Sequence, residues 1–538
     1  MVSNRCFANL FAIAMFRTEV IVRVKCKFIR SLFVLPVVFA GSMWFQSSAA
    51  VDIDWHKHYN DSCQGINLDG AVRYVAERGL KPRKPVTVGI IDSGIDTAHV
   101  DLVPSLWVNQ REVRNGKDSD RNGYVDDIHG WNFLGTADGS FNMTSAGTEE
   151  YREFKRLFPK YKGVDESSVT DRAEYDYYMT MRRKAGIDSY LKFYAYNMMK
   201  DEAYRYIDSV ARTIHGVIPD TMKAAAVAVS APDDSRFEEA VGVIGVDLLR
   251  AGEETGWNRL YAGHRDDLAL MEKRLGSIEG DADKRLLMGD DLKNADDICY
   301  GNPCLQASDC EHGTFVAGVI AGQGISDPRV TGIYPQAGLM ILRAVPDGDE
   351  YDKDVSTAIR YAVDNGARVI NMSLGKLTSP DSAMVNSAIA YALRHDVLLV
   401  QAAGNSHIDI DPIGYFPSAI DADGRIYDNF IRVAASDRQG NPAPMSNYGR
   451  CKVDLFAPGV DITSTKPGNG YMTADGTSIA TPVVSAVAAM IRAYFPKLKA
   501  SQVKDILVRS SRPVDALEGK SRGGIVDAYE AIKMASEY

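Results

Sequence analysis

The sequence of 538 residues has few cysteines, no excess of positive charge and, after its first 50 residues, no long uninterrupted hydrophobic run. The net charge of −10, with no basic stripe, argues against nucleic acid as a partner. The lack of a long apolar run argues against a membrane span in residues 51–538, since a crossing helix needs about 20 consecutive apolar residues. Shares of 25% charged and 45% hydrophobic residues are those of an ordinary globular protein.

Hydrophobic sequence is concentrated near the N-terminus instead. An apolar segment at residues 32–40 is followed by the small residues Ser47-Ser-Ala-Ala50 and preceded by four basic residues, Arg23, Lys25, Lys27 and Arg30. This pattern is typical of an export signal that is cut near Ala50. An uncleaved anchor is the alternative. We predict a signal peptide at residues 1–50, a periplasmic or extracellular protein, and no membrane contact after cleavage.

The seven cysteines fit an oxidising compartment, and two of them would leave with the signal peptide. Cys304 and Cys310 are close in sequence and flank a loop, so we predict a disulfide between them. A zinc site that combines these two with Cys299 and His312 also fits the spacing. That site would consume a histidine for which the motifs below indicate another role.

Three short motifs place a serine, a histidine and an aspartate at the ends of apolar segments. Gly476-Thr-Ser-Ile-Ala-Thr-Pro482 leads into an uncharged run, so Ser478 would stand in the first turn of a buried helix, beside free backbone N–H groups. Pro482 predicts a kink or a shifted start of this helix. His312 begins a helix of small residues, and Asp92 ends an apolar strand where parallel sheets bind ligands. Each motif alone is also compatible with a helix cap or a strand end.

Taken together, and in the order Asp92, His312, Ser478, the motifs resemble those of the subtilisin-like serine peptidases, whose triad has this chain order. The resemblance implies a three-layer α/β fold, with a mostly parallel sheet covered by helices on both faces. It also implies an endopeptidase that acts on proteins or peptides through an acyl-enzyme. An inactive binding protein of the same fold is the alternative. An esterase is disfavoured because Gly-x-Ser-x-Gly is absent around Ser478.

The resemblance also assigns residues around the scissile bond. Asn405 matches the family's oxyanion asparagine, whose amide would act together with the Ser478 N–H. Two segments match the walls of the first specificity pocket, and their edges would pair with the substrate backbone. They comprise Ser373, Leu374, Gly375, Ala402, Ala403 and Gly404. Because alanine and glycine leave room, we expect a preference for apolar or aromatic side chains.

An acidic loop follows the aspartate strand. It places side-chain oxygens at alternate positions with a glycine for the turn, as in the first part of a calcium loop. The predicted ligands are Asp118, Asp120, Asn122 and Asp126, with the carbonyl of Tyr124. The twelfth position is His129 rather than glutamate, so the loop is not a complete EF-hand, and a polar surface turn is the alternative. Related secreted peptidases use calcium, so the resemblance favours a structural calcium ion.

The chain between Asp92 and His312 is much longer than the fold needs, since the two are 220 positions apart. Residues 135–298 are rich in charge and tyrosine, and apolar residues recur at helical spacing. We predict a helical insertion at 135–298 within a peptidase domain at 51–538. We expect its helices to pack on one another and on the rim of the cleft, as a cap that restricts access.

After His312, strand-like and helix-like segments alternate. This pattern predicts a parallel sheet covered on both faces. The expected strands are 338–345, 369–375, 398–405, 430–435 and 454–459, and the expected helices are 354–365, 382–394, 499–510 and 527–537.

Overall fold

A computed structural model describes residues 52–538 except 232, 281–282, 299 and 422. The predicted signal peptide and Cys299 therefore lie outside the described residues.

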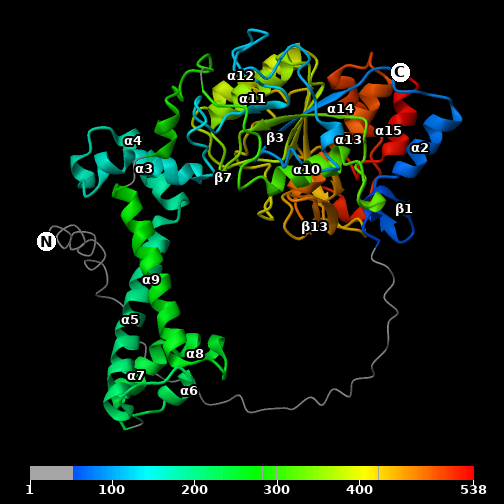
Figure 1. The fold of residues 1–538 in the computed structure, drawn as a ribbon. Helices are drawn as coiled ribbons and strands as arrows, with labels where there is room; N and C mark the ends of the chain where they lie inside the picture. The colour runs from blue at the N-terminus through cyan, green and yellow to red at the C-terminus, as the bar shows by residue number, and fades with distance from the viewer. Residues whose placement is uncertain (1–51, 232, 281–282, 299, 422) are drawn as a thin grey trace, which may run out of the picture. The chain divides into compact units, whose positions relative to one another are not determined.

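A parallel sheet of seven strands forms the centre of the fold (Figure 1), in the order β11-β10-β9-β8-β3-β6-β4. Every neighbouring pair in this sheet is parallel. The predicted α/β class with a mostly parallel sheet is thus confirmed. The strands are β3 (Thr87–Asp92), β4 (Gly130–Asn132), β6 (Gly338–Arg343), β8 (Val369–Met372), β9 (Leu398–Ala402), β10 (Phe430–Ser436) and β11 (Leu455–Pro458).

Helices cover both faces of the sheet, because successive side chains of a strand point to opposite sides. In β3, Val88 and Ile90 belong to one apolar core and Ile91 to the other. The first core is closed by α2 (Leu68–Glu77), α10 (Glu311–Ala321), α13 (Thr477–Tyr494), α14 (Ala500–Arg509) and α15 (Ala528–Ala535). The second is closed by α11 (Asp352–Asp364) and α12 (Ser382–Arg394). Among the described helices, α13 alone is long and apolar enough to cross a membrane, but 89% of it is buried within the protein.

Small sheets and short helices connect these layers. The two-stranded sheets pair β1 (Tyr59–Asn60) with β2 (Cys63–Gln64), β12 (Ile462–Lys466) with β13 (Gly470–Ala474), and β5 (Ser145–Gly147) with β7 (Asp347–Gly348). The 3-10 helices are η1 (Trp55–Lys57), η2 (Val103–Ser105), η3 (Glu166–Ser168), η4 (Lys284–Met288), η5 (Pro328–Val330) and η6 (Asp515–Leu517). Strands β8 and β9 end earlier than predicted, because the chain leaves the ladder at Ser373 and Ala403 to form loops.

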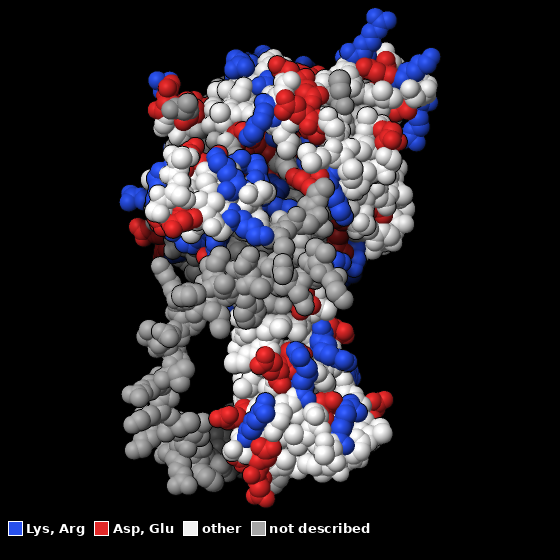
Figure 2. All heavy atoms as spheres, turned by 90° about the vertical axis from the view of Figure 1, so that its left-hand side faces the viewer, with Lys and Arg blue, Asp and Glu red and all other residues white. Residues whose placement is uncertain are grey.

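Among the described residues, seven α-helices and the short 3-10 helix η3 lie between Glu149 and Gly280. The α-helices are α3 (Glu149–Tyr161), α4 (Arg172–Lys184), α5 (Ile187–His215), α6 (Ala224–Val227), α7 (Ser235–Val243), α8 (Gly245–Ala251) and α9 (Trp257–Gly280). Phe154 and Tyr178 belong to an apolar cluster that joins α3 to α4, and Tyr204 and Trp257 belong to one that joins α5 to α9. The long helices α5 and α9 run side by side (Figure 1), and acidic and basic side chains intermix on their exposed faces (Figure 2). The helices therefore pack on one another, as predicted.

A buried ion-pair network fixes the chain where it returns from these helices. Arg285 in η4 donates to both carboxylate oxygens of Asp354, at 2.7 and 2.8 Å, and to Asp290 at 2.7 Å. Lys353 donates to the same oxygen of Asp290 at 2.9 Å. All four side chains are almost completely buried. Two cations thus compensate two carboxylates at the start of α11.

Arg285→Ala should lower the free energy of unfolding by about 3–5 kcal/mol, because it leaves the Asp354 carboxylate buried without a cationic partner. Chemical denaturation followed by circular dichroism measures the change. The control is Arg329→Ala, which removes an exposed pair with Asp327 and should leave the unfolding free energy almost unchanged. Equal effects of the two substitutions would contradict the anchoring role.

Candidate active site

The three motifs meet at the carboxyl edge of the sheet. Asp92 is the last residue of β3, and the neighbouring strands β8 and β9 end at the same edge. His312 and Ser478 lie in the first turns of α10 and α13, each as the second residue of its helix. The sheet therefore brings together side chains that are up to 386 positions apart, from 92 to 478.

Asp92 and His312 form a direct hydrogen bond. The ring Nδ1–H of His312 donates to Asp92 Oδ1 at 2.8 Å, and the same oxygen accepts the Ser93 backbone N–H at 2.8 Å. This contact holds the proton of the neutral ring on Nδ1 and leaves Nε2 as the acceptor. Burial lowers the pKa of His312, but the charge of Asp92 and its hydrogen bond raise this pKa by more, so the net shift is upward.

Ser478 and Asn405 lie next to each other beside Gly476. A Cβ atom on Gly476 would lie 3.1 Å from Ser478 Oγ and 3.4 Å from Asn405 Nδ2. The amide of Asn405 is oriented by Thr477, whose N–H and hydroxyl both donate to Asn405 Oδ1 at 2.9 Å. Its Nδ2 group is therefore turned to the Ser478 side as a donor. Sequence analysis missed Thr477, although it directly precedes the serine.

Pro482 lies within α13 without ending it, so the predicted shift of the helix start is wrong. Proline has no N–H, and the carbonyl of Ser478 therefore lacks its intrahelical donor. The Ser373 hydroxyl donates to this carbonyl instead, at 2.7 Å. Ser373 in turn accepts from Asn371 at 3.0 Å, and Asn371 accepts from Ser485 at 2.8 Å. The first turn of α13 is thereby tied to the end of β8.

A pocket of about 230 Å³ opens beside Asn405. Of the six predicted substrate-binding residues, Gly375 and Gly404 line it. Ser373 contacts α13 instead, and Ala403 is buried in another apolar cluster. Leu374 and Ala402 are buried as well. Sequence analysis missed further lining residues, among them Thr148, Glu150, Asp349 and Tyr415. Glu150 belongs to α3, so the insertion meets the pocket through its first helix.

The prediction that the insertion restricts access to the cleft stays a prediction.

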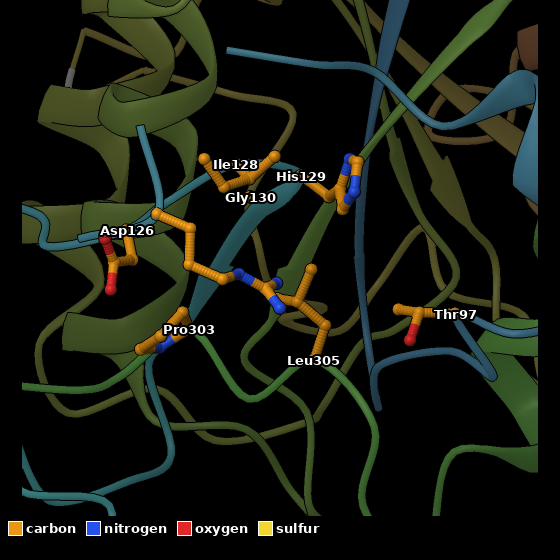
Figure 3. Close-up of a pocket in the computed structure, with 8 residues that line it drawn as sticks. Thr97, Asp126, Ile128, His129, Gly130, Pro303 and Leu305 are labelled. Carbon is orange, nitrogen blue, oxygen red and sulfur yellow. The ribbon is translucent and has the colours of Figure 1, made fainter. Parts of the chain in front are cut away.

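A second hollow of only about 60 Å³ lies near Thr97 and Leu305 (Figure 3). Its other lining residues include Asp126, His129 and Pro303. A volume of this size holds a few water molecules, and we assign it no function.

The acidic loop does not bring its predicted ligands together, so the predicted set needs correction. Asp118 accepts the backbone N–H groups of Asn122 and Gly123, at 3.1 and 2.8 Å. Asp126 accepts those of Asn115 and Gly116, at 2.8 and 3.0 Å. Both side chains therefore shape the turn. The Asn122 amide donates to Asp127 at 2.9 Å.

Asp120 instead belongs to a cluster with Glu112 and Asp127. One oxygen from each of the three lies within 4.8 Å of the others. The Asp120 side chain is only 4% exposed, and its Oδ1 is buried without a hydrogen-bond partner. Burial raises the pKa of Asp127, and the charge of Asp120 adds to that shift. Sequence analysis missed Glu112 because it lies before the loop.

The predicted disulfide between Cys304 and Cys310 is wrong, since both are free thiols. The exposed Cys304 contacts the Gln306 carbonyl, whereas Cys310 is buried at the start of α10. The two sulfurs thus face different surroundings. The zinc alternative includes Cys299, which lies outside the described residues, and Cys304, Cys310 and His312 do not form a ligand cluster within the part of the chain that the structure describes.

Comparison with known proteins identifies the family. The family model for peptidase S8, the subtilase family, matches residues 290–527. A thermophilic serine proteinase of Bacillus sp. (strain AK1) is 32% identical over 236 residues, which cover 44% of this chain and 54% of that protein. Subtilisin BL of Lederbergia lenta is 36% identical over 197 residues, which cover 36% of this chain and 68% of that protein.

A solved structure, that of the prenylagaramide maturation protease PagA, is 33% identical. The match covers 42% of this chain and 82% of that chain, with a TM-score of 0.37, too low to add to the argument. The chain belongs to the subtilase family. It spans about half the length of several curated relatives, such as the proteinase of strain AK1. Asp92 and helices α3 to α9 precede the residues that the family model matches.

Asp92→Asn should lower the pKa of His312 relative to the unchanged protein, because the imidazolium then loses the stabilising charge of Asp92 and its hydrogen bond to that carboxylate. In the unchanged protein we expect this pKa to lie above 6.5. Nuclear magnetic resonance of histidine-labelled protein measures both values, and His312→Gln assigns the signal. Asp327→Asn, far along the chain and exposed, serves as the control. An unchanged pKa in Asp92→Asn would contradict the coupling.

Proposed function

We propose that this protein is an exported serine endopeptidase that hydrolyses peptide bonds in proteins or peptides. One observation carries the proposal: Asp92, His312, Ser478 and Asn405 meet at one edge of the sheet. Asp92 and His312 form a hydrogen bond of 2.8 Å there. The Ser373 hydroxyl binds the Ser478 carbonyl at the same edge, and Asn405 lies beside the serine. Membership of the subtilase family supports it. The sequence pattern of residues 1–50 supports export, since it has the order of a signal peptide.

In the proposed mechanism, Ser478 Oγ attacks the carbonyl carbon of the scissile bond while His312 Nε2 takes its proton. Asp92 keeps the ring in this tautomer and stabilises the imidazolium that forms. The carbon–nitrogen bond breaks as His312 gives the proton to the leaving amine. Water, deprotonated by His312, then releases the acyl group from Ser478.

The negative charge that develops on the carbonyl oxygen needs two donors. The Asn405 amide nitrogen is available because Thr477 holds the other end of the amide. The Ser478 backbone N–H stands in the first turn of α13, where N–H groups have no intrahelical acceptor. Donors fixed in this way favour the transition state, since they need no reorganisation when charge appears.

Ser478→Ala should lower kcat on a peptide substrate by about 10⁶, the order of loss known for the equivalent serine in subtilisin itself. The fold should persist, because alanine is small and α13 keeps its Ser373 contact to the backbone. Steady-state kinetics and a melting curve measure both. The matched control is Ser501→Ala, the exposed second residue of α14, which should retain full activity. Similar turnover by both variants would overturn the mechanism, whereas inactivity of the unchanged protein would favour a binding role.

We also propose a structural calcium ion held by Glu112, Asp120 and Asp127. Carboxylate oxygens within 4.8 Å of one another suit the calcium–oxygen distances of 2.3–2.6 Å. The buried Oδ1 of Asp120 has no other partner. The nearest cation on Asp120 is Arg111, at 3.4 Å and 63% exposed, which compensates little of the charge. A divalent cation would offset the cost of burying three carboxylates together.

Removal of calcium with a chelator should lower the melting temperature, because an ion that binds only the folded protein stabilises it by mass action. Asp120→Asn should abolish this dependence on chelator. Asp118→Asn in the same loop should keep it, because Asp118 shapes the turn. Elemental analysis counts the bound ion. Equal chelator sensitivity in both variants would refute the ligand set.

A further inference from the structure

The pocket beside Asn405 differs from the roomy apolar slot that its glycine walls suggest. A Cβ atom on Gly375 would lie 2.4 Å from the Tyr415 hydroxyl, and one on Gly404 would lie 2.6 Å from it. The side chain of Tyr415 therefore lies between the two walls of the pocket. A side chain at position 375 or 404 would collide with the tyrosine ring unless the ring moved. The Tyr415 residue is 7% exposed, and its hydroxyl makes no hydrogen bond to any residue in the described part of the chain. The hydroxyl is not fully buried and borders the pocket, so it can form a hydrogen bond with an occupant.

Two carboxylates line the same pocket. Glu150 comes from the first turn of α3, and Asp349 follows β7, which pairs with β5 just before α3 (Figure 1). Asp349 uses one oxygen to accept the Glu149 backbone N–H at 2.7 Å. Glu150 accepts the Thr378 hydroxyl at 2.5 Å through one oxygen. One oxygen of each side chain is thus left without a hydrogen bond to any described residue. Burial raises the pKa of Asp349, and the charge of Glu150 adds to the rise.

The cations nearby are already engaged. Lys376, which also lines the pocket, directs its ammonium to Glu149 at 2.6 Å, Asp352 at 2.9 Å and the Glu350 carbonyl at 2.7 Å. These three contacts use all its donors. Arg152 donates to the carbonyls of residues 147, 349 and 350 and to the Glu149 carboxylate.

The remaining neighbours leave the balance negative. Lys184 donates to the Thr378 hydroxyl, at 3.1 Å, rather than to a carboxylate. Five carboxyl groups therefore lie near three cations. The carboxyl groups belong to Glu149, Glu150, Asp349, Glu350 and Asp352, and the cations are Arg152, Lys184 and Lys376. Burial raises the pKa of Glu350 to about 7, so this carboxyl contributes less negative charge at neutral pH than the other four. The start of α3 adds a partial positive charge of roughly half a unit. A negative excess remains, and Glu150 and Asp349 carry it into the pocket.

We propose that this pocket binds a lysine or arginine side chain of the substrate, immediately before the scissile bond, through Glu150, Asp349 and the Tyr415 hydroxyl. The proposal rests on the proposed peptidase function and differs from the preference for apolar or aromatic side chains that we expected from the sequence. A basic side chain supplies N–H donors to all three groups, and an arginine can bond two oxygens at once. An apolar side chain would displace water from two carboxylates and give them no partner. The insertion therefore supplies part of the substrate specificity.

The test measures kcat/KM of the full-length protein on quenched fluorescent peptides that differ only before the scissile bond, with arginine, lysine, phenylalanine, leucine or glutamate. Arginine and lysine should be preferred by about 10- to 100-fold, the range for charge-assisted hydrogen bonds. The double variant Glu150→Gln, Asp349→Asn should lose this preference, because its kcat/KM on arginine and lysine should fall to the level of its kcat/KM on phenylalanine. Both substitutions are isosteric and retain an oxygen for Thr378 and for the Glu149 N–H.

The matched control is Asp347→Asn, an exposed carboxylate two residues before Asp349 that does not line the pocket, and its preference should be unchanged. A preference of the unchanged protein for phenylalanine or leucine, or a basic preference that survives in the double variant, overturns this inference and leaves the peptidase function intact. If no peptide is cleaved, the function itself fails. In that case, isothermal titration calorimetry with the Ser478→Ala variant tests the pocket by measuring peptide affinity. A tetrapeptide ending in arginine must bind more tightly than the same peptide ending in phenylalanine, and equal affinity refutes the inference.

Discussion

The contact between the first turn of α13 and the loops after β8 and β9 is the constraint on which the site depends. Ser478 lies at this junction, where Pro482 frees a carbonyl that the Ser373 hydroxyl then occupies at 2.7 Å. Thr477 binds the Asn405 amide from the same turn. Nucleophile and oxyanion donor are thus fixed by one set of backbone and side-chain bonds. Because α13 is buried along most of its length, this arrangement is as rigid as the core itself.

The insertion is compatible with this core because both of its ends are held at the sheet. At the entry, β5 pairs with β7, and Arg152 binds carbonyls on both sides of that pairing. At the exit, Arg285 pairs with Asp354 at the start of α11. Between these points, helices α3 to α9 satisfy their apolar faces against one another. The catalytic layers therefore need no rearrangement to accommodate about 130 residues of helices and connections, from 149 to 280.

Local patterns predicted most of the fold. Apolar periodicity predicted α12 with the bounds Ser382–Arg394 and the other expected segments after His312 within a few residues, but it missed the hairpin of β12 and β13. The triad and Asn405 could be assigned from motifs because each motif is short and its strand or helix setting is local. The pocket could not be predicted in this way, because Tyr415, Glu150 and Asp349 reach it from three separate segments. The acidic cluster could not be predicted for the same reason, since Glu112 lies outside the loop whose spacing suggested the ligands. The prediction of a disulfide was wrong because closeness in sequence does not indicate burial. Of the two cysteines, Cys310 is buried and Cys304 is exposed.

The dual position of α3 bears on what the insertion does. Its first turn supplies Glu150 to the pocket, and its later turns pack against α4. Replacing the entire insertion with a linker would remove Glu150 and Arg285 as well as the long helices, and would therefore alter specificity, anchoring and access at once. A deletion confined to α5–α9 leaves α3, α4 and η4 in place, together with the ion pairs at both ends. Only that shorter deletion separates restricted access from charge recognition, because the two effects arise from different helices of the same insertion.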